Sequence, residues 1–358
     1  MSDDRRLSAP GRLSNAGDLP EADPEGAGRV ATAMMPDGSL ADFAQQHGLR
    51  PSAERPPVLA YLRQVWLRWS FILAFATARN IAMYTEARLG QLWQVLTPLL
   101  NVAVYWLIFG VILDTSKGIP DFLSFLVVGV FVFNYTQRAF ISTSKVITDS
   151  LPLIRALQFP RASLPLAYVM IELQQMFLSM AVLIVIILIN GEPVTWYWLL
   201  TIPILLLQTI FNVGVGLFVA RLGSQVDDFS QLLPFLLRTW MYLSGVMFSI
   251  ATLTHVPAKA KAILQLNPAA LYITLMRNSL LLSQRLSFPG SKPPNAALCL
   301  RWHHYVSTDP NSVKYLSAYC PAPANPAHYW YYAIGWAVLA MVVGFFFFWR
   351  AEAKYGRG

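Results

Sequence analysis

The stretch LGQLWQVLTPLLNVAVYWLIFGVIL, residues 89–113, contains no charged side chain. A helix needs about 20 apolar residues to cross the hydrocarbon core of a bilayer, so this stretch alone is long enough. The rest of the chain has the same character, because 55% of its 358 residues are hydrophobic and only 13% are charged. Soluble domains carry about 25% charged residues. The sequence therefore predicts an all-α integral membrane protein.

Further runs lack charged residues apart from Arg138, and the shortest of them, 239–254, is preceded by the apolar residues 232–237. They cover residues 122–143, 173–191, 193–220, 239–254 and 329–349. Together with residues 89–113 they predict six transmembrane helices. An even number of spans places both termini on the same side of the membrane.

The basic residues indicate which side this is, since Lys and Arg concentrate in short cytoplasmic loops. Only Lys117 lies in the short loops opposite the C-terminus. The face shared with the C-terminus carries Lys145, Arg155, Arg161, Arg221, Arg350, Lys354 and Arg357. We therefore expect both termini in the cytoplasm. The net charge of +8 does not predict nucleic-acid binding, because these residues are scattered and form no basic stripe.

The segments on the cytoplasmic side differ from the spans. Residues 1–57 are rich in Ala, Gly, Pro and Asp and predict a disordered cytoplasmic tail. Residues 58–88 predict an amphipathic helix in the membrane interface, or alternatively an ordinary helix packed on the bundle. Its apolar stripe would consist of Leu62, Val65, Trp66, Trp69, Leu73 and Ala76. Residues 89–253 then hold the first five spans, with a cytoplasmic loop at 144–163.

The opposite side carries the remaining segments. Within residues 254–285, a short apolar stretch is broken at Asn267–Pro268, which predicts a re-entrant pair of helices on the extracytoplasmic side. Residues 286–327 are polar and Pro-rich and predict a small extracytoplasmic cap. Residues 328–358 hold the sixth span and a cytoplasmic C-terminus.

The predicted cap contains both cysteines of the chain, Cys299 and Cys320. In an oxidising compartment we expect them to form a disulfide, worth roughly 3 kcal/mol for a loop of this size. Free thiols are the alternative. A further alternative is that the two cysteines bind a metal ion together with His303 and His304. The spacing of these residues matches no zinc pattern, so we predict no metal site.

Two charges fall inside the predicted spans at similar depth, Arg138 in the second and Glu172 in the third. Because an unpaired charge in a membrane is costly, we expect an intramembrane ion pair. A proton relay is the alternative, but it would need several carboxylates or histidines in the spans, and only Glu172 qualifies.

Catalytic motifs are missing from the sequence. No Gly-Lys dipeptide occurs, so the chain has no phosphate-binding loop of the G-x-x-x-x-G-K-[ST] type. H-E-x-x-H and G-x-S-x-G are absent as well. We therefore predict no catalytic residue and no cofactor in this chain.

Aromatic residues in two spans are candidates for a substrate conduit, since their rings offer apolar faces and polar edges to sugars. The alternative is an interfacial aromatic belt, which is common for Trp and Tyr. The candidates are Tyr105, Trp106 and Phe109 in the first span and Trp240, Tyr242 and Phe248 in the fifth.

Four segments together carry a family resemblance. They are YTEARLGQLWQVLTPLL (84–100), LIRALQFPRASLPLA (153–167), RLGSQVDDF (221–229) and LNPAALYITLMRNSLL (266–281). In this order and spacing they resemble permeases of the ABC-2 type. More narrowly, residues 59–350 resemble the transmembrane subunits of bacterial exporters for O-antigen, capsule, teichoic acid and galactan. The long N-terminal tail and the cysteine-containing cap depart from the minimal members of the family.

The resemblance implies a transporter subunit of the bacterial cytoplasmic membrane and not an enzyme. It implies a homodimer that recruits two separate ATPase subunits, which bind ATP and Mg²⁺. The implied substrate is a lipid-linked polysaccharide, with cell-wall galactan first and O-antigen or teichoic acid second. A drug exporter of the same superfamily is the main alternative, and a membrane-embedded glycosyltransferase is the alternative among enzymes.

The resemblance also implies a coupling helix that docks on the ATPase, in the loop after the second span. Residues 151–160 match it, with Pro160 and Pro165 ending the helix before the third span. Leu153 and Phe159 would be its apolar anchors, and Arg155 would add a directional contact. Alternatively, Arg155 and Arg161 only anchor the loop to the inner leaflet.

Overall fold

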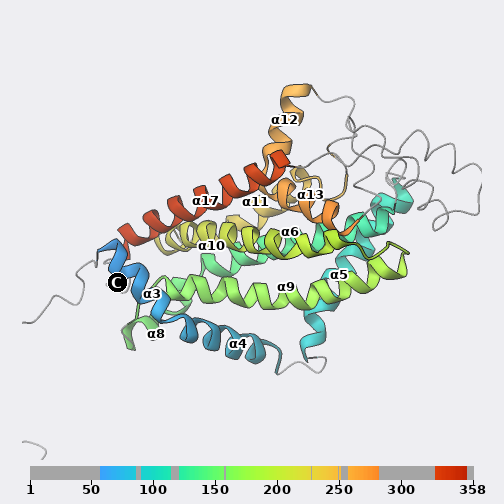
Figure 1. Ribbon diagram of the computed structural model, residues 1–358. Coiled ribbons are helices and arrows are strands. Elements are labelled where there is room, and N and C mark those ends of the chain that lie inside the picture. The colour runs from blue at the N-terminus through green and yellow to red at the C-terminus, as the bar shows by residue number, and fades with distance from the viewer. Residues whose placement is uncertain are drawn as a thin grey trace, which may run out of the picture. The chain divides into compact units, whose positions relative to one another are not determined.

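The computed structural model describes residues 57–85, 90–113, 121–156, 159–226, 228–248, 250, 257–281 and 327–352. Within these ranges all regular elements are helices, which confirms the predicted all-α class (Figure 1). These helices belong to one compact unit, because the chain divides after Glu54. Residues 1–56 of the predicted tail and 286–326 of the predicted cap, including Cys299 and Cys320, lie outside the described residues.

Within the described residues, five helical segments are long and apolar enough to cross a membrane. They correspond to five of the six predicted spans. They are Val95–Ile112, Phe122–Ser144, Ser163–Ile189, Trp196–Gln225 and His328–Arg350. The elements are α5 (Trp93–Tyr105) with the π-helical η2 (Trp106–Ile112), α6 (Phe122–Ser144), α9 (Ser163–Ile189), η3 (Trp196–Leu200) with α10 (Thr201–Gln225), and α17 (Ala327–Arg350).

The predicted fifth span, 239–254, is not one continuous helix. Its first residues belong to α11 (Phe229–Leu243), which begins earlier than predicted and ends at Leu243. The chain then turns at Gly245, whose φ of +65° is a conformation that glycine adopts without steric cost. The turn ends the helix inside the apolar run, so composition alone predicted its end wrongly.

Two short helices follow, α12 (Ala258–Leu266) and α13 (Pro268–Leu280), and the break between them lies at Asn267. The Asn267 side chain accepts a hydrogen bond from the main-chain N–H of Ala269, and Pro268 occupies the first helical position. Both are preferred at a helix start. α13 packs against α6, α10 and α17, and the re-entrant course of the pair stays a prediction.

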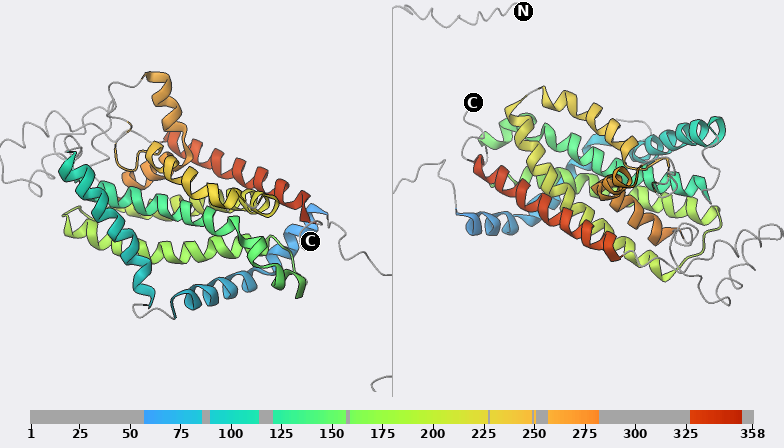
Figure 2. Two further views of the ribbon diagram at one scale, coloured as in Figure 1. Left: turned by 180° about the vertical axis from the view of Figure 1, so that it is seen from behind. Right: turned by 90° about the horizontal axis from the view of Figure 1, so that it is seen from above.

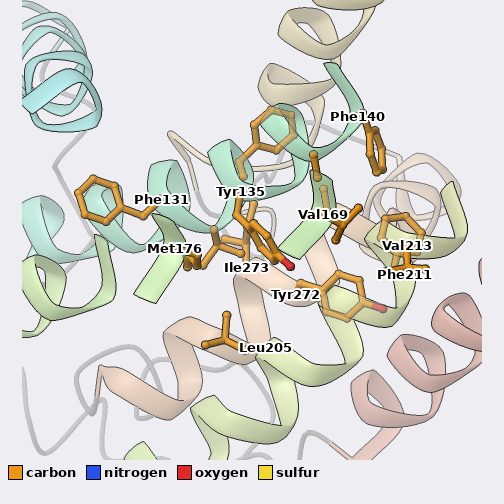
Figure 3. Packing of buried hydrophobic residues seen from close by; sticks show 14 of the residues in the cluster. Phe131, Tyr135, Phe140, Val169, Met176, Leu205, Phe211, Val213, Tyr272 and Ile273 are labelled. Carbon is orange, nitrogen blue, oxygen red and sulfur yellow. The ribbon is translucent and has the colours of Figure 1, made fainter. Parts of the chain in front are cut away.

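The core lies between α6, α9, α10 and α13. α6 is central, because most of its side chains are buried. Figure 3 shows rings and branched side chains from all four helices meeting there: Phe131, Tyr135 and Phe140 of α6, Val169 and Met176 of α9, Leu205, Phe211 and Val213 of α10, and Tyr272 and Ile273 of α13.

The predicted interface helix is divided at Arg68 into α3 (Val58–Leu67) and α4 (Trp69–Thr85). α4 packs on α9, and the side chains that α3 and α4 bury are Tyr61, Ile72 and Ala76. Of the predicted stripe, Ala76 is therefore buried and Val65 partly buried, whereas Leu62, Trp66, Trp69 and Leu73 are exposed. The exposed apolar side chains form the face that is available to the membrane interface.

α10 and α17 lie side by side, with their backbones closest at Gly214 and Gly344 (Figure 2). A Cβ at Gly344 would collide with the carbonyl oxygen of Gly214, and a Cβ at Gly214 would collide with the backbone of Ala340. Between helices in lipid, small residues replace the missing hydrophobic driving force by allowing close van der Waals contact. The two glycines thus set the distance between α10 and α17.

We predict that Gly344→Ala destabilises the protein by about 1–3 kcal/mol, because the added methyl group overpacks the contact between α10 and α17. Gly335→Ala on the same helix is the matched control, since a Cβ there meets nothing within 4 Å. The control should be neutral or stabilising, as Ala is the better helix former. Thermal unfolding in one detergent measures both, and equal behaviour of the two variants would contradict the proposed packing.

Candidate coupling and conduit sites

The predicted coupling segment lies at the end of the bundle that carries α3, α8 and the last residues of α17, which we call the coupling end (Figure 1). Two short helices follow α6 there, α7 (Val146–Asp149) and α8 (Leu151–Ala156). α8 covers only the first part of the predicted helix 151–160. Pro165 does not end it but lies in the first turn of α9, where proline needs no hydrogen-bond partner.

The two predicted anchors of this segment pack on their own chain. Leu153 is partly buried against the core, and the ring of Phe159 lies 5.7 Å from the ring of Phe71 on α4. α4 thus offers Phe159 an aromatic neighbour within its own chain, and the role of the two side chains as anchors for a partner stays a prediction. The exposed residues of α8 are Pro152, Arg155 and Ala156.

The other two predicted coupling residues also contact the chain. Pro160 is buried. The main-chain N–H of Arg161 donates to Oε1 of Glu352 at 3.1 Å, and its guanidinium donates to the Glu352 carbonyl oxygen. The loop between α8 and α9 is thus attached to the residues that follow α17.

The structure brings Arg138 of α6 and Glu172 of α9 together. Nε of Arg138 lies 3.3 Å from Oε2 of Glu172, and the two side chains are 30% and 10% exposed. Near the end of α4, burial raises the pKa of the Tyr84 phenol, and the charges of Arg138 and Glu172 act on this pKa in opposite directions. The pair joins two core helices and compensates the charge of a carboxylate that is almost fully buried.

The conduit candidates divide into exposed and enclosed residues. Trp106 and Tyr242 are 43% and 46% exposed, and Tyr105, Phe109 and Phe248 are partly buried. The Tyr105 hydroxyl lies 4.0 Å from the sulfur of Met241, which brings α5 to α11. The helices that carry the two predicted groups, α5 and α11, therefore approach each other at this point.

Trp240, in contrast, packs on the rings of α6. Its ring stacks on Phe140 and meets Phe133 edge to face, with centroids 6.0 and 5.6 Å away. Its indole N–H donates to Oδ1 of Asn267 at 2.9 Å, and the Asn267 amide donates to Ser244 Oγ at 3.1 Å. Helical spacing indicated the face of Trp240 but not that Asn267 would use its polar edge.

The sequence analysis missed Arg277, which lies buried in α13 and directs its hydrogen bonds to main-chain carbonyls. It donates to the carbonyl oxygens of Phe125, Gly245 and Val246 at 3.1, 2.9 and 2.7 Å, and its guanidinium carbon lies 3.3 Å from the centre of the Phe125 ring. Gly129 leaves the space, because a Cβ there would collide with the guanidinium. A lone arginine after an apolar stretch was the available signal.

The described residues offer no group of three His, Cys, Asp or Glu side chains that could hold a metal ion. The features just described are instead those of helix packing and of surfaces for other molecules.

For the ion pair we predict that Arg138→Met destabilises the protein by about 2 kcal/mol. This is less than the roughly 3–5 kcal/mol of a fully buried pair, because the arginine is 30% exposed. Adding Glu172→Gln should restore part of the loss, since it removes the uncompensated charge. A double-mutant cycle by thermal unfolding measures the coupling, and additive losses would contradict it.

For Arg277 we predict that Arg277→Met costs more than about 3 kcal/mol, because three carbonyl oxygens lose their donor in a dry environment. Arg277→Lys should lose less, as it keeps a charge and a donor. Arg63→Met on the exposed face of α3 is the control and should change stability by less than about 0.5 kcal/mol. Thermal unfolding in detergent compares the stabilities of the three variants. An Arg277→Met variant as stable as the wild type would refute the role of Arg277 as the donor to these carbonyl groups.

Comparisons with known proteins agree with this architecture. The family model of the ABC-2 type transporter matches residues 71–281, from α4 to the end of α13. An O-antigen export system permease protein of Myxococcus xanthus, RfbA, is 24% identical over 217 residues, which cover 61% of this chain and 82% of that protein. Two proteins of the same name from Klebsiella pneumoniae are each 25% identical over 58% of this chain, and the matches cover 79% and 78% of their lengths.

The match of the family model covers more than half of the chain and includes four of the five spanning segments together with α12 and α13. It confirms the resemblance that four short segments indicated. The chain therefore belongs to the ABC-2 type transporter family, as a multi-pass membrane permease and not an enzyme.

Proposed function

We propose that the chain is the membrane subunit of an ATP-driven exporter that moves a lipid-linked cell-envelope polysaccharide across the bacterial cytoplasmic membrane, with galactan as the substrate. The relatives support the polysaccharide class, because they are named as O-antigen export permeases. The choice of galactan over O-antigen or teichoic acid rests on overall likeness of sequence.

The observation that carries the proposal is the polarity of the outward faces. α17 exposes apolar and tyrosine side chains between Tyr331 and Phe346, as a lipid-facing helix should. α5 exposes Thr97 and Asn101 among its apolar residues, and α11 exposes Arg238 and Thr239. Polar groups inside a span face a water-filled cavity or a partner and not lipid. α5 and α11 thus have the surface expected around a polar conduit.

A second copy of this chain would complete that conduit. α5 and α11 approach each other at Tyr105 and Met241, and we infer that their exposed polar residues share one side of the bundle. In a homodimer in which these sides of the two copies face each other, the polar residues of α5 and α11 no longer contact lipid. The exposed rings of Trp106 and Tyr242 then lie where sugar rings would pass, and aromatic faces pack well against sugars.

The energy source lies outside this chain, since permeases of this family work with ATPase partners. We propose that two ATPase subunits, carrying ATP and Mg²⁺, dock at the coupling end on the exposed residues of α8, with Arg155 as the directional contact. Both termini then lie in the cytoplasm. Leu153 and Phe159 hold the loop on the bundle instead of reaching the partner.

The complex with its ATPase, reconstituted in liposomes, tests the function. We expect ATP-dependent transfer of a fluorescent polyprenyl-linked galactan between leaflets, with stimulated ATP hydrolysis, and no transport of a cationic dye. Transfer of a polyprenyl-linked O-antigen in place of galactan would correct the substrate but keep the class. Dye transport without transfer of either polysaccharide would overturn the proposal in favour of a drug exporter.

Variants in the same assay test the conduit. Asn101→Leu and Arg238→Leu should each lower transfer about tenfold, because losing a polar contact worth about 1.4 kcal/mol has this effect. Val338→Leu on the exposed face of α17 is the matched control and should transfer normally. If the Arg238 side chain only extends to the membrane surface, the Arg238→Leu variant will transfer the polysaccharide at the same rate as the Val338→Leu control.

A further inference from the structure

Three segments that are far apart in sequence meet at Glu352, directly after α17. The Tyr61 hydroxyl of α3 donates to Oε2 of Glu352 at 2.7 Å, and the main-chain N–H of Arg161 donates to Oε1 at 3.1 Å. Tyr61 in turn accepts a hydrogen bond from the main-chain N–H of Ala162 at 3.0 Å. Each polar group of this Glu352 node therefore has a partner from another segment.

The node is buried, which makes its hydrogen bonds costly to break. Tyr61 is 1% and Glu352 8% exposed. Burial raises the pKa of the Glu352 carboxyl, and the hydrogen bonds from Tyr61 and Arg161 oppose this shift. A buried acceptor that loses its donors is penalised by its full desolvation cost, so the three segments tend to move together.

The node also captures the end of α17. The last carbonyl groups of a helix lack partners within the helix and attract cationic side chains. Arg161 donates to the carbonyl oxygen of Glu352, and Arg221 at the end of α10 donates to that of Phe347. The loop after α8 and the end of α10 are thus both fixed to α17.

At its other end α17 contacts the re-entrant helices. The Tyr272 hydroxyl of α13 donates to the carbonyl oxygen of Ala333 at 3.0 Å, and the Trp336 indole N–H donates to that of Leu266, the last residue of α12, at 2.9 Å. A helix of 24 residues is about 36 Å long, so α17 connects the two ends of the bundle.

We propose that α17 transmits movement of the coupling loop to the re-entrant helices α12 and α13, and that Glu352 is the positioning residue that joins the loop to α17. This inference rests on the proposed docking of the ATPase at α8. Arg161 follows α8 after a short loop that contains the buried Pro160, so a displacement of α8 reaches Arg161 directly. The node then transmits the displacement to α17. From α17 it reaches α13 through the contact of Ala333 with Tyr272, and α12 through the contact of Trp336 with Leu266.

Labelling rates of single introduced cysteines test the path in the complete complex with the ATPase. Ala156→Cys on α8 and Ile263→Cys on α12 are exposed positions. Their reaction with a maleimide is measured without nucleotide and with ATP and vanadate. The wild-type chain, whose only cysteines are Cys299 and Cys320, supplies the background. We expect ATP and vanadate to change the rate at both positions.

The same measurement is repeated with Glu352→Gln and with Tyr61→Phe, which keep the shape of the node but remove its charge or its donor. We expect the response at residue 156 to persist and the response at residue 263 to be lost. Tyr331→Phe, an exposed tyrosine of α17, is the control and should keep both responses. Thermal unfolding of the same samples shows that the variants are folded, and a structural defect alone would not separate the two positions.

The outcomes separate this inference from the proposed function. A response at residue 263 that survives in both node variants overturns the transmission path and leaves docking at α8 intact. A wild-type complex without any response at residue 156 overturns docking at α8 and the path with it. Failure to transfer galactan concerns only the substrate.

Discussion

A main-chain carbonyl inside a membrane must find a donor within the protein, and this constraint decides how α11 can end before the bundle does. The turn after Leu243 presents the carbonyl oxygens of Gly245 and Val246 to an apolar interior. Arg277 supplies donors to both and to Phe125, and the absence of a side chain at Gly129 gives it room. The interruption is therefore stable only together with α13, which carries the arginine.

The distribution of polar groups follows from the same constraint. Inside the bundle, the charges of Arg138 and Glu172 compensate each other, and Arg277 is neutralised by carbonyl dipoles and an aromatic ring. On the outside, α17 is apolar, whereas α5 and α11 expose Asn101 and Arg238. A chain that compensates these charges inside the bundle has a reason to leave polar groups on one outward side, and a shared conduit supplies that reason.

Sequence reasoning succeeded where local chemistry decides the structure. Uncharged runs located five spans, Asn267–Pro268 located the break between α12 and α13, and similar depth placed Arg138 near Glu172. It failed where a tertiary neighbour decides. The run 239–254 is uncharged throughout, so only the turn at Gly245 reveals the end of α11. The resemblance assigned Phe159 to the ATPase and periodicity assigned Trp240 to a conduit, and neither shows that Phe71 and Asn267 lie beside them. The contact of Tyr61 with Glu352 joins residues 291 positions apart, beyond any local pattern.

The glycine contact between α10 and α17 bears on how movement could pass through the bundle. Because the backbones touch at Gly214 and Gly344, sliding one helix along the other would drive larger neighbouring residues into the contact. The bond from Arg221 to Phe347 fixes the same pair at the coupling end. α10 and α17 should therefore move as one body, by rotation and not by shear. Since α13 packs against both helices, such a rotation carries α13 with it, and Arg277 would transfer the motion to the turn after α11.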